Sequence, residues 1–381
     1  MALVHISSLP LTNSPRYHLI KRPQNNAPVN LQLKCSMSRQ VPHSPHPRKS
    51  ANYQPTIWSY NFLQSLRIDE LDEESGNRGK NLEEEVRCKV NNEKTELLSI
   101  LELIDDIQRL GLGYRFHKDI KKALNRINLS WKKYEDKVKA ENKLHATALR
   151  FRLLRQHGYH ISQDVFKTFV DQKGNYMANL HKDIKGMLSL YEASYLAFEE
   201  EKLLEEAQTF STTHLTDLQR NVDPAISQLV THALELPLHH RMQRLEARWY
   251  IEVYSERNDP NYLLLELAQL DFNRVQSVYQ KDVKDMSRWW KEIDLANKLD
   301  FARDRLMECF FWTVGMVPDP QFSNCRKGLT KVTTFITIID DIYDVYGSLD
   351  ELELFTDVLE RFALYKNSSI NKTFSSDSLS T

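Results

Sequence analysis

Three carboxylates stand close together near the C-terminal end of the chain, within residues 337–344. Asp340, Asp341 and Asp344 occupy positions i, i+1 and i+4. If this stretch is a helix, Asp340 and Asp344 lie one turn apart on the same face, whereas Asp341 points about 100° away and is less well placed to share a ligand. Magnesium suits such a pair, because it takes one or two protein carboxylates and completes its octahedron with water and phosphate oxygens.

A solvated acidic helix face is the alternative explanation of this pattern. Residues 105–109 offer a comparison, since they read Asp-Asp-Ile-Gln-Arg and carry an arginine where a last carboxylate would be needed. We therefore expect Asp105 and Asp106 to be solvated surface residues. For Asp340 and Asp344 both interpretations stay open on this stretch alone, and other segments have to decide between them.

Two arginines precede the carboxylates in the sequence, Arg303 and Arg305. Positions i and i+2 do not share a face of a regular helix, so a loop or a helix end would present both side chains better. Guanidinium groups match the geometry of phosphate. The alternative is local ion pairing with neighbouring carboxylates. Those carboxylates are Asp300, Asp304 and Glu308.

An aromatic run follows the two arginines at Phe310, Phe311 and Trp312. Most such residues pack in a core. An aromatic wall can also face a carbocation and stabilise it by cation–π attraction. Both roles are open for Trp312.

Composition indicates a soluble globular chain. Its 381 residues carry a formal charge of −1, with 41% hydrophobic and 27% charged residues, which is enough for two domains. No apolar run approaches the ~20 residues that span a membrane. The near-neutral charge gives no argument for nucleic acid binding. The four cysteines form no CxxC pair, and the chain has no GxGxxG motif and no P-loop.

The N-terminal region has its own composition. No acidic residue precedes Asp69, and the region is basic and rich in serine. This composition is typical of an organelle transit peptide, which we expect over residues 1–47; an ordinary disordered tail is the alternative. Two adjacent cations, Arg48 and Lys49, then precede Trp58.

From Trp58 onward the apolar pattern predicts one helix after another, and no stretch alternates as a strand would. Asp223-Pro224 reads as the cap and first residue of a helix, and Ser162 as the cap of another. We therefore predict an all-α fold with antiparallel helices. Asn258-Asp259-Pro260 is typical of a domain boundary. The predicted parts are a helical domain over 48–258, a metal-binding domain over 259–365 and a disordered tail over 366–381.

Taken together, these segments resemble the plant terpene synthases, in particular the plastid monoterpene synthases of flowering plants. Residues 340–344 match the DDxxD motif, 303–305 match RxR, and Arg48-Lys49 with Trp58 is similar to RRx8W. Two further stretches are similar to family signatures, Leu-Arg-Phe-Arg-Leu-Leu-Arg-Gln-His-Gly-Tyr at 149–159 and Arg-Leu-Glu-Ala-Arg-Trp-Tyr at 244–250. The resemblance runs from about Arg48 to Phe362.

The resemblance implies a carbon–oxygen lyase, a monomer of the plastid stroma, that ionises geranyl diphosphate with Mg²⁺ or Mn²⁺ to give a monoterpene. It implies two helical domains, an N-terminal barrel-like one and a class I terpene cyclase bundle. Asp340 and Asp344 would bind the metal, and Arg303, with Arg305 nearby, would bind the leaving diphosphate. Trp312 would line the hydrocarbon pocket.

Two features depart from the family pattern. Lys49 replaces the second arginine of RRx8W. Lysine keeps the positive charge but cannot donate two parallel hydrogen bonds as a guanidinium does. Because the motif is associated with cyclic products in the family, this replacement favours an acyclic product. The family's second metal motif, (N/D)Dxx(S/T)xxxE, has no match in the residues after Asp344. We therefore expect an incomplete catalytic domain.

Three functional interpretations remain. The favoured one is a monoterpene synthase. The second is an inactive terpene synthase chain that acts, if at all, as a helical binding partner. The third is a prenyl-chain elongating enzyme, which is disfavoured because only one DDxxD motif is present and a long helical region precedes it.

Overall fold

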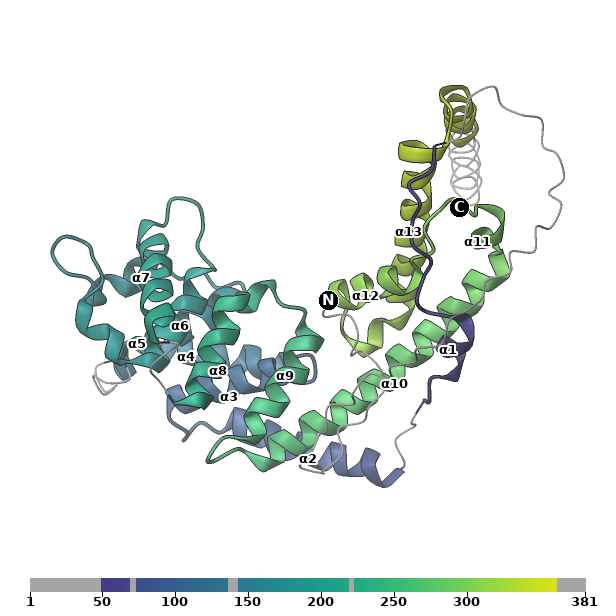
Figure 1. The fold of residues 1–381 in the computed structure, drawn as a ribbon. Helices are drawn as coiled ribbons and strands as arrows, with labels where there is room; N and C mark the ends of the chain where they lie inside the picture. Colours follow the sequence, from purple (N-terminus) through teal and green to yellow (C-terminus); the bar gives the residue numbers. More distant parts are fainter. Residues whose placement is uncertain (1–48, 69–72, 136–142, 219–222, 362–381) are drawn as a thin grey trace, which may run out of the picture. The chain divides into compact units, whose positions relative to one another are not determined.

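The computed structural model describes residues 49–68, 73–135, 143–218 and 223–361. These residues form helices joined by turns, with one isolated β-bridge between Val170 and Tyr176 and no strand among them (Figure 1). The predicted all-α class is confirmed. None of the described helices is both long and apolar enough to cross a membrane. The expected leader at 1–47, Arg48 and the expected tail at 366–381 lie outside the described residues.

The chain divides into two compact units. Of the described residues, 49–68, 278–317 and 321–361 form unit 1, and 73–135, 143–218, 223–277 and 318–320 form unit 2. The main division between the units falls after Ser277, inside helix α10 (Tyr262–Ile293). The domain boundary predicted from the sequence, at 258/259, lies in the turn before this helix. That boundary stays a prediction. The described N-terminal segment, 49–68, groups with unit 1.

Unit 2 is a bundle of helices built around α5. Its α-helices are α2 (Glu73–Asn91), α3 (Leu97–Arg109), α4 (His117–Glu135), α5 (Lys143–Gln156), α6 (Ile184–Ser194), α7 (Lys202–Leu218), α8 (Pro224–Glu235), α9 (Gln243–Ser255) and the first half of α10. Its 3₁₀ turns are η3 (Gln163–Phe169), η4 (Ala178–Lys182) and η5 (Leu238–His240). Helix α5 packs against α3, α4 and α6, and its side chains from Leu144 to Leu154 are all buried. A helix that is covered on every side in this way needs no polar face.

The predicted helix starts at Ser162 and Asp223 are confirmed. The Ser162 hydroxyl accepts a hydrogen bond from the Asp164 backbone N–H at 3.2 Å. The Asp223 carboxylate accepts one from the Ala225 backbone N–H at 2.9 Å, with Pro224 as the first residue of α8. Each cap satisfies one of the backbone donors that a helix start leaves unpaired.

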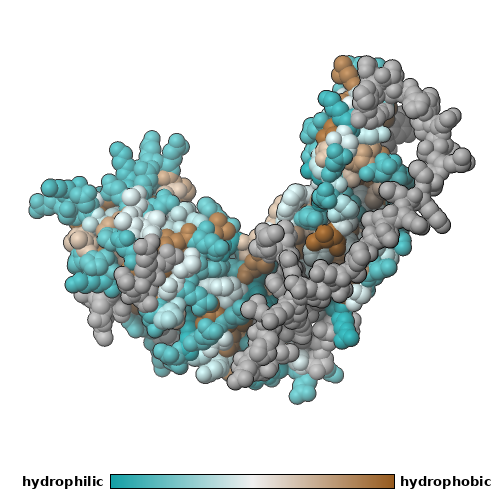
Figure 2. All heavy atoms as spheres, in the orientation of Figure 1, coloured by the Kyte–Doolittle hydropathy of each residue, from teal (hydrophilic) through white to brown (hydrophobic). Residues whose placement is uncertain are grey.

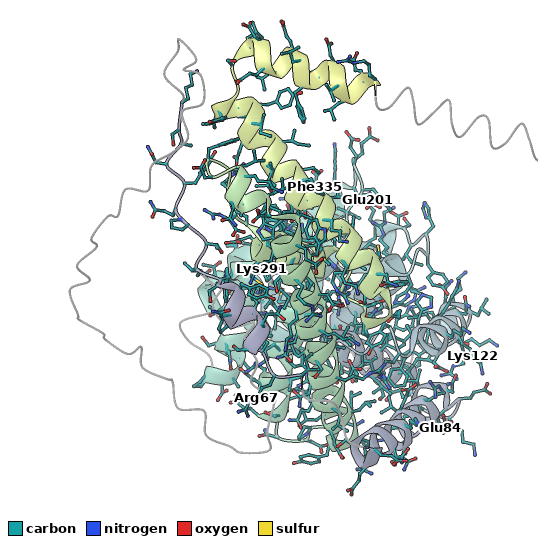
Figure 3. All side chains as sticks on the ribbon, turned by 90° about the vertical axis from the view of Figure 1, so that its right-hand side faces the viewer. Arg67, Glu84, Lys122, Glu201, Lys291 and Phe335 are labelled. Carbon is teal, nitrogen blue, oxygen red and sulfur yellow. The ribbon has the colours of Figure 1, made fainter. Side chains whose placement is uncertain are left out.

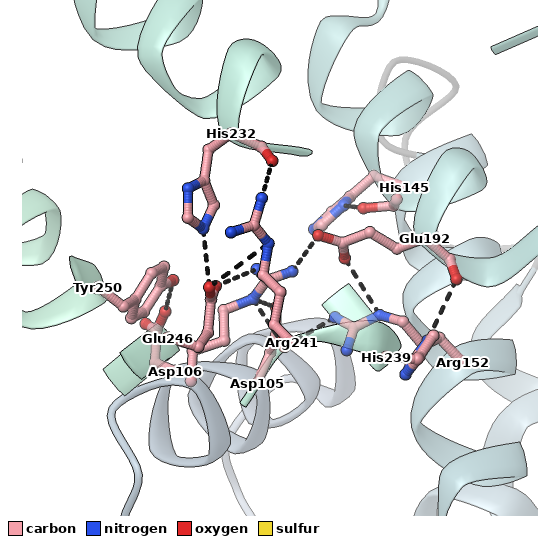
Figure 4. Close-up of polar contacts among 12 residues, drawn as sticks. Asp105, Asp106, His145, Arg152, Glu192, His232, His239, Arg241, Glu246 and Tyr250 are labelled. Carbon is pink, nitrogen blue, oxygen red and sulfur yellow. Dashed lines mark hydrogen bonds and ion pairs between the residues drawn. The ribbon is translucent and has the colours of Figure 1, made fainter. Parts of the chain in front are cut away.

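The interior of unit 2 contains a charged network, part of which is drawn in Figure 4. Arg152, whose side chain is 1% exposed, lies 2.7 Å from Asp105 and 3.2 Å from Glu192. Arg109 pairs with the same two carboxylates. Burial acts to raise the pKa of Asp105, but the charges of Arg109 and Arg152 outweigh it and hold this pKa below its usual range.

The expectation that Asp105 and Asp106 are solvated surface residues is therefore wrong. Asp106 accepts a hydrogen bond from the Tyr250 hydroxyl at 2.7 Å and pairs with Arg257 at 3.1 Å. An arginine in place of a last carboxylate argues against a metal site, but it does not imply exposure, because Arg109 and Arg152 supply the positive charge that allows Asp105 to be largely buried.

His239 gives this network a pH dependence. Its Nδ1 lies 3.3 Å from the Gln156 amide nitrogen and its Nε2 lies 3.3 Å from the Glu192 carbonyl oxygen, so the neutral ring uses both nitrogens. Burial, and then the charge of Arg152, lower the pKa of His239 to about 4. The unfolded chain takes up the same proton near pH 6.5. Between about pH 6.5 and pH 4 the unfolded state therefore binds more protons.

We expect the free energy of unfolding to fall as the pH drops through this window, by about 2 kcal/mol from His239 alone at about pH 5. Urea unfolding at several pH values measures the loss. Gln in place of His239 keeps a hydrogen-bond donor and acceptor but does not titrate. The free energy of unfolding of His239→Gln should therefore fall by about 2 kcal/mol less over the same pH range. An unchanged pH profile in this variant would contradict the assignment.

Unit 1 contains the described N-terminal segment and the helices around the three carboxylates. Its elements are α1 (Tyr60–Ser65), the second half of α10, α11 (Leu295–Lys298), α12 (Leu306–Met316), most of η6 (Pro320–Phe322), α13 (Ser323–Asp341) and the π-turn η7 (Ile342–Tyr346), followed by a helix over 349–361. Helix α12 packs against α13, and the helix over 349–361 runs across the end of α13 (Figure 3).

A buried ion pair joins α10 to α13 in unit 1. The Arg326 guanidinium, which is fully buried, donates from Nε and Nη2 to one oxygen of Asp282 at 3.0 and 2.8 Å. Its Nη1 donates to the Val317 carbonyl oxygen at 2.7 Å, and its plane lies over the Tyr279 ring. This pair fixes the helix that carries the three carboxylates.

Candidate active site

The exposure of the three carboxylates follows from one buried stripe on α13. The stripe consists of Arg326, Thr330, Thr334, Ile338 and Asp341. Asp341 continues its helical spacing and is 1% exposed, so Asp340 lies about 100° away on the solvent side. Asp344 follows in η7 and is also exposed. Four residues make about one turn, so helix geometry still predicts Asp340 and Asp344 on the same side, and both are exposed.

An apolar face of α13 precedes Asp340. Its exposed members are Val332, Phe335, Ile336 and Ile339, which are spaced as i, i+3, i+4 and i+7. Phe335 is labelled in Figure 3, and its ring meets the Trp289 ring edge-to-face at 5.7 Å. Apolar residues are also visible among the polar ones over unit 1 in Figure 2. The two exposed carboxylates thus stand at the end of an apolar face.

Arg303 lies in the loop before α12, as the i, i+2 spacing indicated. Its Nε is 2.8 Å from Asp341 Oδ1, and its backbone N–H donates to Asp341 Oδ2 at 2.7 Å. The guanidinium carbon lies 4.9 Å from the centre of the Tyr53 ring. The hydrogen bond to Asp341 raises the pKa of Arg303, with further contributions from the charges of Asp341, Tyr53 and Asp340.

Arg305 makes different contacts. Its Nη2 donates to the Gln54 carbonyl oxygen at 2.7 Å and its Nη1 to the Asp304 carbonyl oxygen at 2.8 Å. Arg305 therefore holds the N-terminal segment in this structure. Within the described part of the chain, neither Arg303 nor Arg305 forms an ion pair with the three neighbouring carboxylates considered from the sequence.

The remaining predicted residues lie around this group. Trp312 is on α12 and is 57% exposed, whereas Phe310, two residues earlier, is buried. Lys49 is exposed in the N-terminal segment. Trp58 contacts the Phe62 ring and, with Trp290, lines a cavity of about 220 Å³ in unit 1. The substrate-binding role of Trp312 and the cyclisation role of Arg48, Lys49 and Trp58 stay predictions.

Sequence reasoning missed the contacts of Asp341, Tyr53 and Gln54. Asp341 had a usable signal, because it continues the spacing of the buried residues of α13. Tyr53 and Gln54 had none, since a contact between an extended segment and a loop some 250 residues later leaves no periodic pattern.

The two exposed carboxylates fit a magnesium ion. No group of three or more His, Cys, Asp or Glu side chains that could hold a metal occurs among the described residues. The described residues therefore do not offer a site in which protein side chains alone would surround a metal ion. Mg²⁺ needs only one or two protein carboxylates when water and phosphate oxygens supply the rest, and Asp340 and Asp344 provide that number.

Comparison with protein families gives two matches in order along the chain. Residues 57–234 match the family described as "Terpene synthase, N-terminal domain", and residues 291–374 match "Terpene synthase family, metal binding domain". The chain belongs to the terpene synthase family. The metal-binding match contains the RxR and DDxxD motifs and confirms the resemblance found from them.

Curated relatives include plant terpene synthases. The chain is 58% identical over 338 residues to "Probable terpene synthase 12" of Ricinus communis, covering 88% of this chain and 57% of the relative. It is 57% identical over 316 residues to a chloroplastic isoprene synthase of Pueraria montana var. lobata, covering 83% and 51%. The chain spans about half the length of the curated relatives it matches.

Solved terpene synthases share the fold. Isoprene synthase from grey poplar leaves aligns with a TM-score of 0.73 at 55% identity, over 82% of this chain and 57% of that one. Limonene synthase with 2-fluorolinalyl diphosphate aligns with a TM-score of 0.78 at 41% identity, over 83% and 59%.

Proposed function

We propose that this terpene synthase chain is a lyase that ionises geranyl diphosphate in the presence of Mg²⁺, or Mn²⁺, and releases diphosphate to form a monoterpene. The observation that carries the proposal is the arrangement of Asp340, Asp344 and Arg303. Two exposed carboxylates at the end of a helix flank Asp341 in the sequence, and Asp341 pairs with Arg303 at 2.8 Å. Metal and guanidinium are the two groups that can neutralise a leaving diphosphate.

Each side chain has a separate task in this proposal. Asp340 and Asp344 would hold the metal, which supplies Lewis-acid stabilisation of the negative charge on phosphate oxygens when bound. Arg303 would bind the diphosphate through its terminal nitrogens, with Arg305 nearby. Trp312 and the apolar face of α13 would exclude water from the allylic cation, and aromatic rings would stabilise it.

The names of the relatives support the substrate class. They include isoprene, tricyclene and α-thujene synthases. A poplar isoprene synthase structure contains three Mg²⁺ ions and dimethylallyl-S-thiolodiphosphate. The Mg²⁺ ions and the allylic diphosphate analogue in that structure support Mg²⁺ and an allylic diphosphate substrate for this chain. Because isoprene synthases stand among the most similar relatives, dimethylallyl diphosphate is the second candidate substrate. Lys49 favours an acyclic product if geranyl diphosphate is the substrate.

The relatives' chloroplastic names support a plastid location, and we propose the stroma. A catalytically inactive chain that acts as a helical binding partner is the alternative function. The exposed apolar face on α13 supports this alternative, since such faces commonly mark contact surfaces.

Product analysis tests the proposal. The chain is incubated separately with geranyl and dimethylallyl diphosphate and Mg²⁺, and volatile products are separated by gas chromatography. We expect a monoterpene from geranyl diphosphate and no product when EDTA is present. If dimethylallyl diphosphate gives isoprene and geranyl diphosphate gives no product, dimethylallyl diphosphate is the substrate. No product from folded protein with either substrate would contradict the lyase and favour the binding partner.

A further inference from the structure

Unit 2 contains a cavity of about 410 Å³, and all the residues that line it belong to that unit. This volume lies in the range of small-molecule sites, about 300–1,000 Å³. Four arginines are among the lining residues, Arg109, Arg152, Arg241 and Arg244. The lyase chemistry proposed above uses none of them, because the residues assigned to it lie in unit 1.

The carboxylates around the cavity neutralise these arginines unequally. Asp105, Glu246 and Asp319 line it, and Glu192 lies next to it. Arg109 and Arg152 each pair with both Asp105 and Glu192. Arg241 and Arg244, in contrast, have no carboxylate oxygen of the described residues closer than 3.7 Å. The positive charge that is least neutralised therefore belongs to Arg241 and Arg244.

The same two arginines have unused hydrogen-bond donors. Arg244 is 7% exposed, and its Nε and Nη2 have no hydrogen-bond partner in the described part of the chain. Its Nη1 donates to the Gly111 carbonyl oxygen at 3.2 Å. Arg241 donates from Nε to the Leu236 carbonyl oxygen at 2.8 Å and from Nη2 to that of His232, which leaves Nη1 without a described acceptor. Buried donors without an acceptor are costly, so this wall of the cavity favours an anion.

Two acceptors of the cavity also lack a partner. The Glu246 side chain is 5% exposed, and its Oε2 lies 2.7 Å from His232 Nε2 (Figure 4). Its Oε1 makes no hydrogen bond to a described residue, and Arg109 Nη1 lies 3.9 Å away from it. Oε1 of Gln108 is likewise buried and unpaired. A ligand that satisfies this cavity must therefore accept hydrogen bonds from guanidinium groups and also donate at least one.

The histidine His239 reports the sign of the electrostatic field in the cavity. Burial lowers its pKa to about 4, the charges of Arg152 and Arg109 act in the same direction, and Glu192 opposes them. Burial disfavours a charge of either sign, whereas the contribution of the two arginines reflects a positive field. The lining therefore disfavours a further cation and favours an anion.

We propose that this cavity binds a phosphate ion, with Arg241 and Arg244 as donors to its oxygens and Glu246 as acceptor of its hydroxyl. Inorganic phosphate keeps a proton at neutral pH, so it can both accept and donate hydrogen bonds. Sulfate has a similar shape but no proton at that pH, so its oxygen would face the Glu246 carboxylate with no hydrogen bond between them. The cavity should therefore distinguish the two ions. This inference goes beyond the proposed lyase function and does not depend on it.

Equilibrium dialysis of the full chain against radiolabelled inorganic phosphate tests the inference. EDTA and a constant ionic strength are kept throughout, so that no divalent metal can bind phosphate at the carboxylates of unit 1. We expect saturable binding of one phosphate per chain with a Kd of about 0.1 mM or less, and sulfate should compete at least about tenfold more weakly. This comparison of the two ions needs no variant.

Two variants and a matched control assign the binding to the cavity, and circular dichroism checks that each is folded. Arg244→Gln should weaken phosphate binding about tenfold or more. Arg248→Gln is the control, since Arg248 lies one turn further along α9, pairs with Glu252 at 3.1 Å and does not line the cavity; it should change the affinity by less than about twofold. In Glu246→Gln the amide can donate to a sulfate oxygen, so the preference for phosphate over sulfate should fall to about one.

Several results would overturn the inference. If the folded chain shows no saturable phosphate binding, the cavity holds water alone. Equal competition by sulfate in the unaltered chain would exclude a site that recognises the phosphate hydroxyl. An equal loss in Arg244→Gln and Arg248→Gln would show that binding depends on overall charge, and an unchanged preference in Glu246→Gln would remove Glu246 as the acceptor. If methyl phosphate binds more tightly than inorganic phosphate, the ligand is a phosphate ester and not the free ion.

Discussion

An Asp344→Ala variant is expected to release diphosphate from geranyl diphosphate at least about a hundredfold more slowly than the unaltered chain, a loss of about 3 kcal/mol in transition-state stabilisation. Asp344 is exposed on the same side as Asp340, at the end of the apolar face of α13. With one of two protein carboxylates removed, the metal is held by Asp340 alone, and the charge on the leaving group is poorly neutralised. A coupled assay for released diphosphate measures the rate.

The matched control for this prediction is Glu353→Ala. Glu353 is an exposed carboxylate in the helix over 349–361, nine residues after Asp344 in the sequence. Removing it changes the net charge by the same amount, so it should leave the rate within about twofold. If both variants retain the rate of the unaltered chain, Asp344 does not hold a metal that the reaction needs.

Arg326→Met is expected to lower the free energy of unfolding by about 3–5 kcal/mol. Asp282 is 1% exposed and loses both hydrogen bonds from Arg326, at 3.0 and 2.8 Å, when the guanidinium is replaced by a thioether. The Val317 carbonyl loses its donor in the same step. A buried carboxylate without its cation accounts for most of the loss. Chemical denaturation followed by circular dichroism measures it.

Lys327→Met is the control for the buried pair. Lys327 is the next residue on α13 and pairs with Asp285 at 3.4 Å, where both side chains are about one quarter exposed. Such a pair contributes about 1 kcal/mol or less, so this variant should be nearly as stable as the unaltered chain. If the two substitutions lower the free energy of unfolding equally, burial of the Arg326–Asp282 pair is not the reason why Arg326 stabilises the fold.

Much of the fold could be predicted because it rests on local patterns. The apolar spacing in 97–107, the cap at Ser162 and the pair Asp223-Pro224 each predicted a helix that is present, at α3, η3 and α8. The exposure of Asp340 and the burial of Asp341 also follow from helical geometry once α13 is known to be a helix.

Contacts between distant segments could not be predicted in the same way. Arg305 donates to Gln54, and Tyr53 covers Arg303, although some 250 residues separate these partners. Asp105 was assigned to the surface because the sequence does not show that Arg152, from another helix, pairs with it. Buried ion pairs depend on which helix faces meet, and a single sequence contains no pattern for that choice.

Calorimetric binding of inorganic diphosphate to the intact chain, with and without Mg²⁺, tests the central claim most directly. The claim is that Asp340, Asp344 and Arg303 form a combined site for metal and diphosphate. We expect Mg²⁺ to tighten diphosphate binding at least about tenfold in the unaltered chain and to have no such effect in Asp344→Ala. Diphosphate binding that does not respond to Mg²⁺, or that responds equally in both proteins, would contradict the claim.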